Sequence, residues 1–152
     1  MALPTRAYRG DIVVMVATNA TAPYTYAALC GATSVTLTIS NEITSERVAD
    51  CTDWTLPPQT IKGYGAQNVT ATVNGIWAKE NHEKMLNWAA SQQKVPVRFS
   101  FANVATGDTQ YIDGIAMLSE FGLDNIGNVD GNAVARTISL EFDGSPTFTK
   151  KV

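Results

Sequence analysis

AQNVTATVNGIWAKENHEKMLNWAASQQ, residues 66–93, is the segment that decides the fold, because its hydrophobic period changes part-way from two residues to about 3.6. Its first half alternates apolar and polar residues, which is typical of a strand that buries one face. The apolar positions of that strand are Val69, Ala71 and Val73. From about Lys79 to Gln93 the spacing is helical. The apolar side of this helix is expected to comprise Met85, Leu86 and Ala89. A mostly β chain with one helix covering a sheet is therefore predicted.

Further strands are predicted where apolar runs or alternating residues are bounded by turn residues. These segments are 12–17, 34–40, 95–101, 109–123 and 133–142, and the segment 109–123 is expected to be one strand or a pair of strands. The residues of the second segment that are expected to point inward are Val35, Leu37 and Ile39. The last two segments are expected to pair as an antiparallel hairpin, in which Arg136 is the one charge on an apolar face. The predicted fold class is mainly β, an antiparallel β-sandwich or barrel with one flanking α-helix.

A chain of 152 residues is most simply one domain, since folding at this length buries roughly 70% of the unfolded surface. We expect a single domain over 1–152, with an N-terminal arm at about 1–10 and a short C-terminal tail at about 143–152. No stretch approaches the ~20 apolar residues of a membrane span and no export signal is recognisable, so no membrane binding is expected and the cytoplasm is the default compartment. Cys30 and Cys51 are then expected to be thiols that pack as small apolar groups.

A long polar connection, from about Asn41 to Gly65, separates two of the predicted strands. Its proline pair and the glycines around Tyr64 are expected to interrupt regular structure. Compact domains prefer short connections, so a long one is usually functional. Trp54 and Leu56, which lie beside Pro57 and Pro58, are expected to anchor a partner. The alternative is a loop that folds back over its own core.

The composition argues against several classes of function. A formal net charge of -3 offers no basic surface for tight nucleic-acid binding. His82 is the only histidine and the two cysteines lie far from it in the sequence, so neither a zinc site nor a catalytic triad is indicated. Segment 124–132 resembles a calcium loop only superficially, because Thr137 stands where the final carboxylate ligand is required. We therefore predict no enzyme activity, no metal and no cofactor.

The order of the predicted elements resembles a known family. A short N-terminal arm precedes a strand, and the alternating strand 34–40 runs into a loop that contains VADCTDW, residues 48–54. A glycine-bounded turn, the strand at 68–77, the single helix and a set of C-terminal strands follow. Over nearly the whole chain this pattern resembles the major tail protein of long-tailed, non-contractile bacteriophages and of related gene transfer agents.

The resemblance implies a structural protein of the virion tail that is assembled in the host cytoplasm. Hexameric rings of the chain would stack into a tube through which DNA leaves the capsid without being bound specifically. The loop at 41–65 and the terminal arms would join successive rings, and the terminator and tape measure proteins would meet the tube. The candidate contacts of the loop with the next ring are Asp50, Asp53, Trp54, Leu56, Pro57 and Pro58. Family lumens tend to be acidic, and the candidate lumen acids are Glu42, Glu46, Asp108 and Asp113. Otherwise the same carboxylates would keep the outer surface soluble.

Three rival functions are also compatible with the sequence. A small β-sandwich would bind a ligand such as a sugar through Trp54, Tyr64 and Trp77, and it would stay monomeric at high concentration. A capsid decoration or head-tail joining protein would form knobs on a capsid instead of tubes. A hydrolase is favoured least, because no convergent catalytic site is evident.

Overall fold

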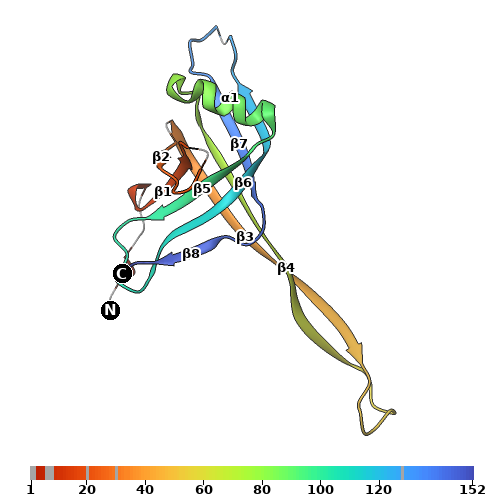
Figure 1. Cartoon of the computed structure of the whole chain (residues 1–152). Coiled ribbons are helices and arrows are strands. Elements are labelled where there is room, and N and C mark those ends of the chain that lie inside the picture. Colours follow the sequence, from red (N-terminus) through yellow and green to blue (C-terminus); the bar gives the residue numbers. More distant parts are fainter. Residues whose placement is uncertain (1–2, 6–8, 20, 30, 128) are drawn as a thin grey trace.

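The computed structural model describes residues 3–5, 9–19, 21–29, 31–127 and 129–152, and Figure 1 shows their arrangement. The strands in this part of the chain are β1 (Ile12–Ala17), β2 (Tyr26–Ala28), β3 (Ala32–Val48), β4 (Gln59–Ile76), β5 (Lys94–Phe101), β6 (Thr109–Asp124), β7 (Ala135–Phe142) and β8 (Thr147–Lys150). The helix and the two 3-10 turns are α1 (His82–Ser91), η1 (Arg9–Asp11) and η2 (Lys79–Asn81). The predicted helix is confirmed, and its first turn is the 3-10 turn η2.

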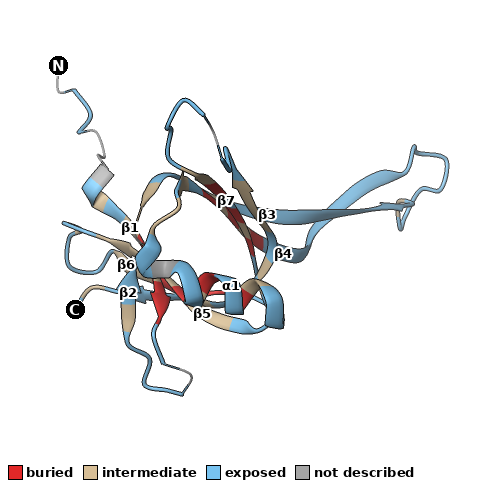
Figure 2. Cartoon of the chain, turned by 90° about the horizontal axis from the view of Figure 1, so that it is seen from above, coloured by how far each residue is buried: buried red, intermediate tan, exposed pale blue. Residues whose placement is uncertain are grey.

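The strands pair antiparallel in a single sheet with the order β2-β1-β5-β6-β7-β4-β3, and β8 pairs with β6 outside this path. The sheet curls, and its buried segments lie on the inner side of the curl (Figure 2). The predicted segment 109–123 is one strand, β6, and it forms the expected hairpin with β7. Arg136 of β7 is 1% exposed, as its place on an apolar face predicted. The predicted fold class, mainly β with one flanking helix, is confirmed.

The segment that switches from strand to helix supplies a large share of the core. The three β4 positions predicted to face inward are at most 4% exposed. On α1 the buried residues are Met85 and Trp88, which share a face because they are three positions apart. The prediction is wrong for Leu86, which is 37% exposed. The Trp88 ring N–H donates to the carbonyl of Gln93 at 2.9 Å, so the indole is buried with its polar atom satisfied.

Most of the loop predicted from Asn41 to Gly65 is instead a regular β-hairpin. β3 and β4 stay paired as far as Val48 and Gln59, and the glycines around Tyr64 lie inside this ladder. The loop prediction is wrong because both faces of the segment are exposed, so its strands carry no apolar alternation that would reveal them. This distal part of the hairpin projects well beyond the body of the subunit (Figure 1).

The position of β3 at the end of the sheet explains a second difference. Val35 and Ile39 were expected to point into the core, yet each is 40% exposed, and that prediction is wrong. Leu37 is the one of the three that packs against the core. An end strand is covered by a neighbour on one side only, so its apolar residues are less completely buried.

The two ends of the chain contribute differently to the body. The segment expected as a C-terminal tail contains β8, which adds a strand to β6. Of the expected N-terminal arm, residues 1–2 and 6–8 lie outside the described part. The connection between β1 and β3 also contains the short strand β2, which the sequence did not indicate.

Candidate assembly surfaces

The distal hairpin is the most prominent surface feature, and we call residues 42–66 the hairpin arm and residues 49–58 its tip. Within the arm every residue is exposed except Asp50, which is half-buried. β7 pairs with β4 only from Thr70 onward, so both outer edges of the arm lack a strand partner in the described chain. Unpaired strand edges are templates for pairing with another chain. Both edges of the arm are therefore available for pairing with another chain.

Large apolar side chains project from the shaft of the arm. Ile43 is 54% exposed, Val48 42%, Ile61 61% and Tyr64 81%. Ile43 and Tyr64 are directly opposite in the ladder, so their side chains lie on the same face. Val48 and Ile61 lie on the opposite face of the ladder, because side chains alternate along a strand. Each face of the shaft therefore carries exposed apolar side chains of the kind that occur at interaction sites.

Two aspartates organise the tip through hydrogen bonds to their own loop. Oδ1 of Asp50 accepts from the N–H groups of Thr52 and Asp53 at 2.8 and 2.9 Å and from the Thr52 hydroxyl at 2.7 Å. Oδ1 of Asp53 accepts from the N–H and hydroxyl of Thr55 at 2.9 and 2.6 Å. These threonine hydroxyls, with the backbone N–H groups, lower the pKa of both carboxyls because they stabilise the charged form. The tip is therefore a negatively charged turn of defined shape.

The tip also presents apolar groups to solvent. Trp54 is 83% exposed and Leu56 50% exposed, and the two prolines that follow are exposed as well. The six residues predicted to contact a partner thus all lie together on the tip. Cys51 lies there too as an exposed free thiol, so the expectation that it packs as a small apolar group is wrong. Cys30 lies outside the described residues.

The four candidate lumen acids lie in two separate places. Glu42 and Glu46 belong to the arm, where Oε2 of Glu42 accepts from the N–H of Ala66 at 3.3 Å. Asp108 lies in the turn before β6, with its carbonyl accepting from the N–H of Lys151 at 2.8 Å. Asp113 lies on β6 in the body. The single subunit therefore does not gather these carboxylates into one surface.

Asp113 is engaged by an arginine that is itself held between two aromatic rings. Its carboxylate accepts from Nε and Nη2 of Arg98 at 2.6 and 3.1 Å. The Arg98 guanidinium lies 4.2 Å from the Tyr26 ring centroid and 4.3 Å from that of Tyr111, within the range of cation–π attraction. The hydrogen bond to Asp113 raises the pKa of Arg98. This cluster ties β2 to β5 and β6 and neutralises one of the proposed lumen charges.

The aromatic residues of the rival sugar site do not converge. Trp54 is on the tip and Tyr64 on the shaft of the arm, whereas Trp77 packs in the body with its ring centroid 5.6 Å from Phe121 and 5.6 Å from His82. His82, the only histidine, is thus an exposed neighbour of Trp77 at the start of α1.

No three His, Cys, Asp or Glu side chains of the described residues come together as a metal site. Across the same residues, no helix has the length and apolar character needed to cross a membrane.

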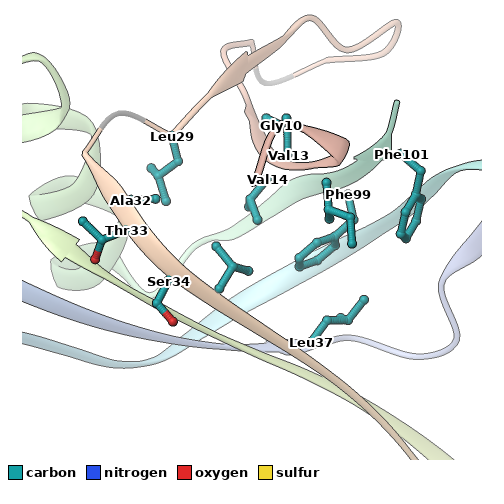
Figure 3. Close-up of a pocket in the computed structure, with 12 residues that line it drawn as sticks. Gly10, Val13, Val14, Leu29, Ala32, Thr33, Ser34, Leu37, Phe99 and Phe101 are labelled. Atoms are coloured by element: carbon teal, nitrogen blue, oxygen red, sulfur yellow. The ribbon is translucent and has the colours of Figure 1, made fainter. Parts of the chain in front are cut away.

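Two hollows mark the body. The larger, of about 960 Å³, opens between β1 and β3, and Figure 3 shows Val14, Leu29, Leu37 and Phe99 around it. We call it the edge groove, and its lining contains no charged residue. The smaller, of about 580 Å³, lies between α1 and the connection from β1 to β2, and we call it the helix groove. Its lining includes Tyr24, Lys84, Asn87, Trp88, Lys94 and Ile115.

The sequence as a whole matches the family described as phage tail tube protein over residues 9–148. The chain belongs to the phage tail tube protein family. No curated protein matches this tail tube protein by sequence.

Solved structures share the fold of this tail tube protein. A chain from the tail of an empty gene transfer agent particle, determined with C6 symmetry, has a TM-score of 0.69 and 10% identity over 95% of this chain and 99% of its own. The SPP1 tail tube has a TM-score of 0.67 and 11% identity over 97% and 81% of the two chains. A sheath-tube complex of an extracellular contractile injection system has a TM-score of 0.63 and 16% identity over 97% and 92%. At such identities the likeness establishes the fold alone.

Sequence reasoning found the tip of this tail tube protein but missed the shaft of the arm. Ile43 and Ile61 were not singled out, although each is more than half exposed. Their signal in the sequence is weak, because an apolar residue in a segment without alternation predicts neither a buried nor an exposed position. The Arg98 cluster was missed for another reason, since Tyr26, Arg98 and Tyr111 come from three different strands.

Proposed function

We propose that this tail tube protein assembles into hexameric rings and that the rings stack into a tube, which conducts DNA from the capsid to the host cell. The hairpin arm carries the proposal. It has two open strand edges and exposed apolar residues along its length, and a neighbouring copy is the natural surface to cover them. The six-fold symmetry of the gene transfer agent tail, whose chain has the same fold, supports six subunits to a ring.

The arm would reach from one ring to the next, with the six predicted tip residues as its contact. The tail of the virion would be the location, and proteins at the tube ends would be the further partners. The fold also occurs in the tube-terminating cap of the anti-feeding prophage, which supports a terminator of related shape. A tape measure protein would occupy the lumen during assembly. No catalytic role, metal or cofactor forms part of this proposal.

A conduit must let DNA slide, so its wall should not attract phosphates. Contacts from lysine and arginine to phosphates dominate affinity for DNA, and this chain has 14 acidic against 11 basic residues. Glu42, Glu46 and Asp108 remain our candidates for an acidic lumen. Asp113 is a weaker one, because Arg98 already compensates its charge.

The assembled protein is therefore expected to show no measurable affinity for duplex DNA at about 0.15 M salt, near physiological ionic strength. Because Asp108 is one of the proposed lumen acids, Asp108→Lys should create binding of duplex DNA that added salt weakens. Rings should still form in this variant. Retention of fluorescent duplex DNA by sedimented tubes measures this. Salt-sensitive binding by the unmodified tube would contradict the sliding conduit.

A further inference from the structure

The helix groove combines an apolar floor with positive charge at its rim. Trp88 is 3% exposed at the base, and Tyr24 and Ile115 add apolar surface. Lys84 and Lys94 supply two ammonium groups. Lys94 already pairs with Asp143 at 2.8 Å, so the charge available to an incoming carboxylate comes chiefly from Lys84. Burial lowers the pKa of Lys84, so its ammonium is incompletely hydrated and would gain from an anionic partner.

The tip of the arm has the complementary chemistry. It presents the apolar groups of Trp54 and Leu56 beside the carboxylates of Asp50 and Asp53. Hydrogen bonds within the tip hold it in one shape, so little conformational freedom remains to be lost on binding. An exposed tryptophan that enters a pocket is a common anchor of protein interfaces. The edge groove lacks this match, because its lining carries no charge to receive the aspartates.

The tip and the helix groove lie at opposite ends of the subunit. In Figure 1 α1 is at one end of the body, and the arm leaves the body toward the other. A subunit therefore cannot place its own tip in its own groove. Contact between the tip of one copy and the groove of another is heterologous, and such contacts propagate into polar stacks when they do not close.

We propose that the helix groove between α1 and the β1–β2 connection receives the hairpin tip of a second copy of this chain. Trp54 would enter over Trp88 and Tyr24, and the tip aspartates would face Lys84. The inference rests on the proposed function, since it names the surface that receives the arm between successive rings.

Disulfide trapping tests this contact, because Cys51 already lies on the tip. Cys30→Ser removes the other thiol, and Asn87→Cys places a cysteine on the exposed side of α1 at the groove. Mild oxidation of the concentrated full-length protein should then give a ladder of covalent dimers, trimers and longer chains on non-reducing gels. A ladder is expected because each copy carries one tip and one groove. The matched control Lys150→Cys, on exposed β8, should give no ladder.

A charge reversal adds a second readout. Lys84→Glu, combined with Asn87→Cys, would set a carboxylate against the tip aspartates and should lower the trapped fraction several-fold, with partial recovery at high salt. Lys79→Glu makes the same charge change outside the groove and should leave trapping unchanged. Tubes that form without a ladder at Asn87→Cys, or with an equal ladder at Lys150→Cys, would overturn the groove assignment and leave the tube proposal standing. Protein that never assembles would overturn both.

Discussion

A subunit whose residues 42–66 are replaced by an Asn-Gly turn is expected to fold and yet to form no tube. The arm contributes no buried residue, so its removal leaves the core intact. Asn41 and Gln67 are paired across the ladder, and an Asn-Gly loop closes such a pair with the twist that a hairpin favours. Stacking should be lost because both the open edges and the tip are removed together.

Circular dichroism and thermal unfolding report the fold of this shortened subunit, and sedimentation velocity reports its assembly. Lys150→Ser, a change on exposed β8 that keeps the whole arm, serves as the control and should assemble like the unmodified chain. A shortened subunit that unfolds would show that the arm belongs to the folding unit. Tubes built from it would show that another surface joins the rings.

Gly75→Ala should be among the most damaging single-methyl additions to the body. A Cβ at Gly75 would lie 2.1 Å from the carbonyl oxygen of Gly31 and 2.9 Å from Cα of Ala32. Both are backbone atoms of the facing chain, so relief requires β3 and β4 to separate where Ala32 pairs with Gly75, at the end of the hairpin that lies in the body. We expect a loss of about 3 kcal/mol of folding free energy, the upper part of the usual overpacking range. For a chain of this length that lowers Tm by roughly 6 to 12 °C.

Gly63→Ala is the matched control on the same strand. A Cβ there would meet only Oγ1 of Thr44, at the ordinary contact distance of 3.5 Å. Alanine is also slightly better than glycine in a strand, so Tm should hold or rise. Differential scanning calorimetry measures the change in Tm of each variant relative to the unmodified protein. Equal changes in Tm for the two variants would refute the close approach at Gly75.

The body was predictable because its strands and helix bury one face and expose the other. Val69, Ala71 and Val73 followed period two, and Met85 followed the helical period, so burial could be read from spacing. The fold class and family resemblance came from the order of these elements. The buried Trp88 was missed because the helical pattern allowed two neighbouring apolar faces, and only packing against the sheet selects one of them.

The arm could not be predicted as a hairpin, because nothing in a single chain buries it. Residues 41–48 and 59–65 lack apolar alternation, and their regularity depends on the ladder between them. The ion pair of Arg98 with Asp113 likewise depends on strand register, which places the two residues directly opposite each other on β5 and β6. Features of this kind arise from pairing between distant segments, and local patterns do not encode them.

Electron microscopy of the concentrated full-length protein tests the tube proposal most directly. We expect hollow tubes of evenly spaced rings, with six subunits visible in each ring viewed along the tube axis. Particles no larger than one 16.3 kDa subunit at every concentration would contradict the proposal.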